Sequence, residues 1–294
     1  MISTIKLPNG NVYNISDPNT FKLPADNAGS HNCIYRGMYI GDTLTTAQAS
    51  AIASGTFDNM YVGDYWSVAS TYNEVYYVIA AFDYFLNKGD TATSGHVVTD
   101  HHVVLLVMNP AYFGYQSGIT TKMNVNTSDT PSTAGGYQAA KSNTADGYLG
   151  CNLNDISTFS DSAFGSTHRL TWYDSWPNTL SSGVPSAGSW YASTIDLMTE
   201  SQAFGHNELT RMNNGSTSVW NYTLSSSQFP IFKYCPSALV PASWTGVAYA
   251  EYYSNIWLRN TFDSQRFCAI DSAGRCNKFY ATAEHAIVPY ICIK

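Results

Sequence analysis

Residues 247–294 read VAYAEYYSNIWLRNTFDSQRFCAIDSAGRCNKFYATAEHAIVPYICIK, and the fold assignment rests on this stretch. Two kinds of position are interleaved in it. One kind consists of framework residues: Trp257, Leu258, Arg259, Phe267, Gly274, Pro289, Ile291 and Ile293. The residues between them are polar or aromatic, and they lack the period of about 2 or 3.6 that a buried strand or helix would impose.

The irregular positions hold the residue types of recognition surfaces. Asn, Tyr, Ser, Asp and His recur there, and binding sites use these residues often. We therefore interpret the stretch as a surface displayed on an apolar scaffold. The alternative is a C-terminal pair of strands with a polar loop.

Composition narrows the function classes. Charged residues make up 12% of the 294 residues, against about 25% in an average protein. The surface must therefore be built from neutral polar groups, including many of the 22 tyrosines, which suits extracellular display and adhesion better than a cytosolic enzyme. The net charge is −7 and no basic run occurs, so we expect no nucleic-acid partner.

The chain carries no segment that points to a membrane. No apolar stretch approaches the roughly 18 residues of a membrane helix, so we expect no membrane insertion. The N-terminus MISTIKLPNG lacks the apolar core of a signal peptide, which predicts that the chain is made and folded in a cytosol.

Three units are expected along the chain. Residues 1–20 predict a β-hairpin around the turn Pro8-Asn9-Gly10, residues 21–30 a linker, and residues 31–294 one large domain. Within that domain we expect strands at 76–81, 102–108 and 228–234, and helices at 47–54 and 193–202. The weakly periodic residues 110–190 predict long loops with short helices near 139–143 and 155–164.

Motifs for metal binding are weak. Cys268 and Cys276 are the only closely spaced cysteines, and no CxxC occurs, so neither a zinc knuckle nor a redox motif is expected. A disulfide between these two stays open. We expect a structural role for the histidines near Asp100, because adjacent strand residues point to opposite faces. These are His96, His101 and His102. Calcium binding by Asp83, Asp90 and Asp100 stays open.

Catalytic motifs are also absent from the sequence. No GxSxG nucleophile elbow occurs, and His168 has no identifiable acid or base partner. Glu200 and Glu208 could be posed as a glycosidase pair, but we interpret both as solvated side chains. We therefore expect no catalytic residue, no metal and no cofactor.

A series of short blocks, in this order and spacing, is similar to a known family. The blocks are NCIYRG (32–37), GTFDNMYVGDYW (55–66), IAAFDYFLN (79–87), HHVV (101–104), GGY (135–137), DLMTE (196–200), SQFPIF (227–232) and WLR (257–259), followed by Phe267, Gly274 and Pro289. Together they resemble tail-associated proteins of gut bacterial phages and prophages with a C-type lectin-like C-terminal domain. Several of those proteins are targets of diversity-generating retroelements.

The resemblance implies a fold and a role. The fold is α+β and C-type lectin-like: a twisted, mostly antiparallel sheet, two flanking helices and long loop inserts, here preceded by the N-terminal hairpin. The role is that of an adhesin at the phage tail tip, made in the bacterial cytoplasm and carried in the virion. Its partners would be a host cell-surface receptor, protein or glycan, and other tail proteins contacted by the hairpin. A homotrimer is expected.

In this family the diversified residues lie near the C-terminus, which implies a variable region at about residues 252–285. Adenine-directed mutagenesis yields Asn, Tyr, Ser, Asp, His, Thr, Phe and Arg among others, and the irregular positions contain these types. The candidate ligand-binding residues are Tyr252, Ser254, Asn255, Asn260, Thr261, Phe262, Ser264, Arg266, Asp271, Ser272, Arg275, Asn277, Phe279, Tyr280, Thr282 and His285. The expected scaffold residues are Trp257, Leu258, Arg259, Phe267, Gly274 and Pro289.

Two departures from the family pattern occur. Ile256 stands where the family often has a second aromatic residue, and residues 286–289 read AIVP instead of Gly-Val-Arg-Pro. Two other functions stay open. One is an enzyme on the same fold, acting on glycans or resembling formylglycine-generating enzymes, for whose reactive cysteine pair Cys268 and Cys276 are a poor match. The other is a purely structural tail component.

Overall fold

The computed structural model of the chain describes residues 4–6, 12–14, 27–70, 74–108, 121–123, 136–177, 180–181, 184–185, 188–206, 208–209, 227–235, 255–262 and 265–294. The fold of these residues is α+β with a mostly antiparallel sheet, in agreement with that part of what the family resemblance implies.

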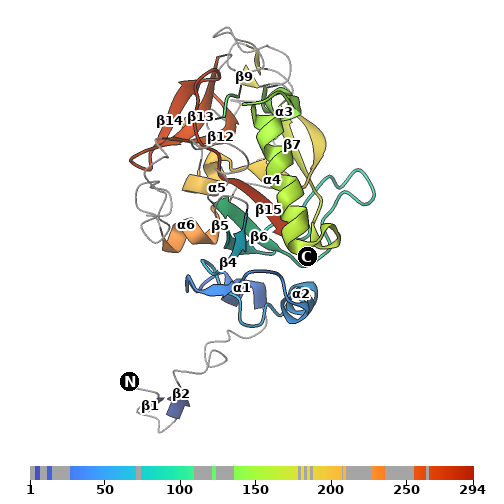
Figure 1. Cartoon of the computed structure of the whole chain (residues 1–294), viewed down its shortest axis with the longest axis vertical. Coiled ribbons are helices and arrows are strands. Elements are labelled where there is room, and N and C mark those ends of the chain that lie inside the picture. The colour runs from blue at the N-terminus through green and yellow to red at the C-terminus, as the bar shows by residue number, and fades with distance from the viewer. Residues whose placement is uncertain are drawn as a thin grey trace.

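A six-stranded sheet forms the centre of the fold (Figure 1). Its order is β11-β15-β6-β5-β4-β3, and all neighbours are antiparallel except β3 and β4. The strands are β3 (Tyr39–Gly41), β4 (Tyr65–Ala69), β5 (Glu74–Phe82), β6 (Val103–Met108), β11 (Ile195–Leu197) and β15 (Pro289–Ile293). The predicted strands at 76–81 and 102–108 are thus confirmed as β5 and β6.

Aromatic side chains cover both faces of this sheet, so β6 and β15 are buried at every position. On one face, Tyr77 packs edge-on against Phe164 with ring centroids 4.7 Å apart. On the other, Trp172 stacks against both Phe85 and Tyr290, with ring centroids 5.3 Å apart in each pair. A strand buried on both faces shows no polar alternation, which is why β6 reads as a continuous apolar run.

Two longer helices flank the sheet. α2 (Thr46–Ala53) confirms the helix predicted at 47–54, and Thr45 and Gln48 cap its start reciprocally. Gly55 follows its end with a φ of +70°. α4 (Leu149–Phe164) includes the helix predicted at 155–164 but begins earlier. The helix near 139–143 corresponds to α3 (Gly136–Ser142).

The predicted linker at 21–30 is partly wrong. α1 (Asn27–His31) begins within it, and both Ser30 and His31 are buried. The imidazole of His31 stacks on Tyr61, with ring centroids 4.9 Å apart, and its Nδ1 hydrogen-bonds to the Met60 carbonyl. This aromatic anchor ties the segment to the core, which a polar linker would not allow. Residues 21–26 lie outside the described residues.

Two element types were predicted wrongly. The helix expected at 193–202 is β11 followed by α5 (Glu200–Phe204), because Ile195–Leu197 pairs with β15 and is buried throughout. Pairing with a neighbouring strand therefore overrides the helical spacing of Ile195 and Met198. The strand expected at 228–234 is α6 (Pro230–Tyr234), whose proline occupies a first-turn position that favours a helix start.

Smaller sheets complete the fold. The predicted N-terminal hairpin is confirmed by the antiparallel pair β1 (Thr4–Lys6) and β2 (Val12–Asn14). Within 110–190, where long loops were expected, β7 (Trp172–Pro177) pairs with β10 (Gly188–Ser193), and β8 (Leu180–Ser181) with β9 (Val184–Pro185). In the described part of the chain, no helix combines the length and apolarity needed to cross a membrane.

Candidate ligand-binding face

The C-terminal stretch forms a separate three-stranded antiparallel sheet, β12 (Asn255–Thr261), β13 (Arg266–Asp271) and β14 (Cys276–Tyr280). In Figure 1 it lies at the end of the fold opposite α1 and α2. β13 is the central strand and β14 is an edge strand. In β14, Asn277 and Tyr280 are exposed and the other three side chains are half-buried, whereas β13 is buried at its four inner positions.

One face of this sheet carries a group of packed aromatic rings. The Trp257 indole lies 6.3 Å from the Phe279 ring and 4.6 Å from the His285 ring, measured between centroids. Trp257 also donates from Nε1 to the Thr121 carbonyl at 2.7 Å. These contacts fix the sheet to the rest of the fold and explain why Trp257 and Phe267 are buried.

The other face meets α5 at one end of β14 and bears cations at the other. Cys276 contacts Glu200 of α5, and its alternate neighbours along the strand are Lys278 and Tyr280. Because β13 is covered on both faces, its side chains show no alternation in the sequence. The missing period that we interpreted as a surface signal is therefore, for β13, the mark of a strand buried on both sides.

The candidate residues fall into three groups by burial. Ser272, Arg275, Asn277 and Tyr280 are exposed, the last with 49% of its surface accessible. The half-buried group consists of Asn255, Thr261, Phe262, Arg266, Asp271, Phe279 and Thr282. Tyr252, Ser254 and Ser264 lie outside the described residues.

Asn260 and His285 form the third group, and a ligand-facing position is wrong for both. Asn260 is 5% exposed, and its Oδ1 accepts a hydrogen bond from the Glu200 amide at 2.8 Å, so it holds the start of α5. His285 is buried between Trp257 and Phe279, and this burial lowers its pKa. Both residues were proposed from their type alone, which does not reveal the direction of a side chain.

Five of the six expected scaffold residues lie inside the fold, and Gly274 lies in the turn between β13 and β14. Trp257 and Leu258 are fully buried, and Phe267 and Pro289 are buried as well. Arg259 donates to the Asp174 carboxylate of β7 at 2.5 Å, and both groups are buried. Gly274 has a φ of +77°, a conformation that glycine adopts at little cost.

A rigid turn presents the tip between β13 and β14. The Asp271 carboxylate accepts hydrogen bonds from the amides of Ala273 and Arg275, at 2.9 and 3.0 Å. The Gly274 amide donates to the Asp271 carbonyl at 2.9 Å. The backbone of the turn is therefore held internally, while Ser272 and Arg275 point their exposed side chains outward.

An aromatic–cationic cluster, defined as Phe262, Arg266, Lys278 and Tyr280, lies at the end of the β13–β14 hairpin away from this turn. The Lys278 ammonium is 3.8 Å and the Arg266 guanidinium 5.0 Å from the centre of the Phe262 ring. Arg266 and Tyr280 are paired across β13 and β14, so their side chains share a face. A cluster of this kind can stack on a flat ligand group and bind an acidic one.

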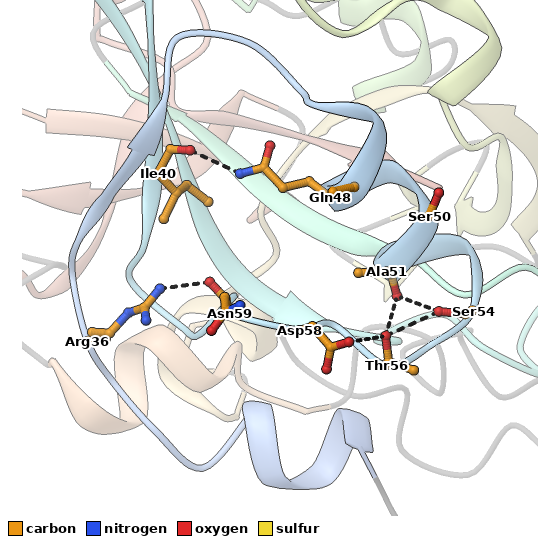
Figure 2. Close-up of a pocket in the computed structure, with 10 residues that line it drawn as sticks. Arg36, Ile40, Gln48, Ser50, Ala51, Ser54, Thr56, Asp58 and Asn59 are labelled. Atoms are coloured by element: carbon orange, nitrogen blue, oxygen red, sulfur yellow. Dashed lines mark hydrogen bonds between the residues drawn. The ribbon is translucent and has the colours of Figure 1, made fainter. Parts of the chain in front are cut away.

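A hollow of about 750 Å³ lies beside α2 (Figure 2). Its polar side chains bond to its own walls: Gln48 donates to the Ile40 carbonyl at 3.0 Å, and Arg36 to the Asn59 carbonyl at 2.8 Å. Arg36 also pairs with the buried Asp64 carboxylate at 2.6 Å. We interpret these contacts as scaffold interactions that hold residues 36–64 together.

The side chains of Asp83 and His102 also accept hydrogen bonds from backbone amides. Asp83 accepts from the His102 amide at 2.9 Å, and His102 Nε2 accepts from the Phe85 amide at 3.0 Å. His102 is fully buried, which lowers its pKa, whereas His101 lies near the surface beside the other Asp83 oxygen at 2.8 Å. The two histidines thus differ in environment, as adjacent strand-end residues should.

Sequence reasoning missed one cluster. Glu200, predicted to be solvated, is fully buried, and its Oε1 accepts from Cys276 Sγ at 3.1 Å and from the Leu209 amide at 2.9 Å. Glu208 is exposed, as expected. Ligand atoms of Glu200, Cys268 and Cys276 all lie within 4.8 Å of one another. The cluster joins distant parts of the chain, so no sequence spacing signals it.

Comparison of the chain with protein-family models, with curated proteins and with solved structures gives no match.

Proposed function

We propose that this chain is a receptor-binding protein of a bacteriophage tail. It would bind a host cell-surface ligand through its C-terminal face, by which we mean the exposed side chains of the β13–β14 turn and of the edge strand β14. One observation carries the proposal. Within a single stretch, the framework positions Trp257, Leu258 and Phe267 are buried, whereas Ser272, Arg275, Asn277 and Tyr280 are exposed on one rigid turn and its edge strand. A scaffold that displays replaceable side chains requires this separation.

The architecture supports a C-type lectin-like fold for this protein. The central sheet is mostly antiparallel and pairs β15 between β6 and β11; α4 packs on β11 and β15, and Gln48 of α2 bonds to β3 and β4. The second, smaller sheet carries the candidate face.

We further propose that the face is a hypervariable target of a diversity-generating retroelement. Substitutions at exposed positions usually change stability by no more than about 0.5 kcal/mol. The turn backbone is held by Asp271 and Gly274, so the side chains at 272, 275 and 277 can change without altering it. The decisive genetic observation is a template repeat beside the gene. Its nucleotide sequence should differ from the codons of residues 252–285 only where the template has adenine.

A homotrimer attached to other tail proteins by the β1–β2 hairpin would multiply weak sites into avidity. In this proposal the chain is made in the bacterial cytoplasm and works in the virion, where the face of each copy meets the host surface. The number of copies can be measured by light scattering coupled to size-exclusion chromatography.

The function is tested with labelled full-length protein on a panel of intact bacterial isolates. We expect the triple variant Arg275→Ala/Asn277→Ala/Tyr280→Ala to bind at least about 10-fold more weakly, since aromatic and arginine side chains dominate binding energies. The matched control is Met38→Ala/Tyr39→Ala, which alters exposed side chains outside the face and should bind like the unmodified chain.

Equal binding by the triple variant and the unmodified chain would contradict the proposed face. Absence of binding to every isolate would favour a structural tail component. Turnover of cell-wall glycans that disappears in Glu200→Gln would favour the enzyme. The thermal midpoint of each variant must be unchanged for these results to count.

A further inference from the structure

We propose that Glu200, Cys268 and Cys276 form a zinc site that fastens α5 to the β13–β14 hairpin. Their ligand atoms, two sulfurs and a carboxylate oxygen, lie within 4.8 Å of one another. They come from three elements: Glu200 begins α5, Cys268 lies within β13 and Cys276 begins β14. Convergence of ligands from separate elements is what a metal site requires.

The strand register explains how the two cysteines share a face. Cys268 is paired with Lys278, and Cys276 with Ile270, so the cysteines are diagonal neighbours across the two strands. Diagonal neighbours have Cα atoms about 7–8 Å apart. A disulfide usually needs Cα atoms about 4.4–6.8 Å apart, so this register suits a shared metal better than a disulfide.

The separation also fits the dimensions of zinc coordination. With a Zn–S bond of about 2.3 Å and tetrahedral angles, two thiolates on one ion stand about 3.8 Å apart. The three ligand atoms lie within 4.8 Å of one another, and Cys276 Sγ is 3.1 Å from the Glu200 carboxylate oxygen, so the side chains need to shift only slightly to surround an ion.

The donor set selects the class of metal. Two thiolates with one carboxylate suit zinc, whereas calcium and magnesium prefer oxygen ligands throughout. Cys268 is buried and Cys276 is half-buried, and a zinc ion with these three ligands would take water as its fourth.

Zinc binding must displace the protons of both thiols. Hydrogen bonding with Cys276, burial and the nearby Glu200 carboxylate raise the pKa of Cys268, so the thiols are protonated without metal. Zinc binding forms two Zn–S bonds and one Zn–O bond, breaks both S–H bonds and releases both protons to solvent. The resulting site carries one net negative charge, because two thiolates neutralise the zinc ion and the carboxylate adds one further charge.

The proposed zinc site does not depend on receptor binding, because its ligands face α5. It lies, however, on the strands that carry the aromatic–cationic cluster, with Lys278 directly opposite Cys268. Zinc would therefore hold the candidate face in one arrangement before a ligand arrives, which lowers the entropy cost of binding.

The test uses the full chain, reduced and stripped of metal, and titrates it with Co²⁺ as a spectroscopic probe. We expect a thiolate-to-cobalt charge-transfer band and the visible bands of a tetrahedral ion, at one equivalent per chain, both removed by added Zn²⁺. Cys276→Ser should abolish the charge-transfer signal at one equivalent, and Glu200→Gln should weaken binding at least about 10-fold. Cys33→Ser, which changes an exposed cysteine outside the cluster, is the matched control and should bind like the unmodified chain.

A second measurement needs no variant. Zn²⁺ should slow alkylation of Cys276 by iodoacetamide in the unmodified chain, followed by peptide mass spectrometry, and leave alkylation of Cys33 unchanged. Absence of both the cobalt bands and the protection would overturn the zinc site. So would a Cys268–Cys276 disulfide in freshly isolated protein, or full cobalt binding by Cys276→Ser.

Discussion

The six-stranded and three-stranded sheets use their strands differently. β15 of the larger sheet is buried at all five positions, whereas β14 of the smaller sheet has no fully buried position. The larger sheet is covered on both faces by aromatic side chains, and the smaller one ends in an uncovered edge strand and turn. The difference teaches that the exposed positions proposed for recognition lie on the edge strand of the smaller sheet, while the larger sheet is buried on both faces.

The ion pair between Arg259 of β12 and Asp174 of β7 should give the largest effect. Burial by itself lowers the pKa of Arg259, but the Asp174 carboxylate outweighs it and raises that pKa above its usual value. Arg259→Met leaves Asp174 buried without this partner and should lower the free energy of unfolding by about 3–5 kcal/mol, measured by urea denaturation.

The double variant Arg259→Met/Asp174→Leu serves as its control. It removes both charges and should recover most of the lost stability. A loss below about 1 kcal/mol in the single variant would show that the ion pair does not fasten β12 to β7.

A core substitution in the larger sheet should come next. Ile291 on β15 is fully buried between β6 and β11. Ile291→Ala should lower the free energy of unfolding by about 2–5 kcal/mol, because it leaves a cavity between covered faces. Ile291→Val, which removes a single methylene, should cost about 0.5–1.5 kcal/mol in the same denaturant series. Equal, small losses in both would mean that this sheet is not the stable part.

Acid should destabilise both sheets through their buried histidines. Burial lowers the pKa of His102 and of His285 from the ordinary value of 6.5. As the pH falls below 6.5, the unfolded chain takes up protons that the folded chain does not, so stability declines by up to about 1.4 kcal/mol per pH unit for each histidine.

Urea denaturation between pH 7.5 and 5 measures this decline. His102→Gln and His285→Gln should each flatten the profile, the first through the larger sheet and the second through the smaller one. Profiles in both variants as steep as that of the unmodified chain would assign the acid sensitivity to other groups.

The smallest effect is expected on the edge strand. Asn277 of β14 is exposed, so Asn277→Ala should change the free energy of unfolding by no more than about 0.5 kcal/mol. Thermal unfolding checks this value. A loss above about 1 kcal/mol would erase the distinction between the two sheets, because β14 would then carry stability as well.

Local chemistry made parts of this fold predictable from the sequence. The cap formed by Thr45 and Gln48 marks α2, and the apolar run of β6 marks a strand buried on both faces. The separation of framework and irregular positions in the last fifty residues likewise identified most exposed residues of the candidate face.

Long-range packing set the limits of prediction. Ile195–Leu197 is a strand only because β15 lies beside it, and Asn260 is buried only because α5 begins next to it. The Glu200, Cys268 and Cys276 cluster joins three elements and has no local signature. Residue type alone identified none of these relations.

The position of β15 has a consequence for folding kinetics. The chain between β11 and β15 contains α5, α6 and the whole three-stranded sheet, yet its two ends are hydrogen-bonded neighbours. Pairings so distant in sequence form slowly, and during synthesis the edge of β6 stays open until residues 289–293 have emerged. The entropy lost on closing the segment between β11 and β15 depends on the length of the segment and hardly on its residue types. Substitutions within it therefore leave the closing step nearly unchanged, whereas insertions would alter it.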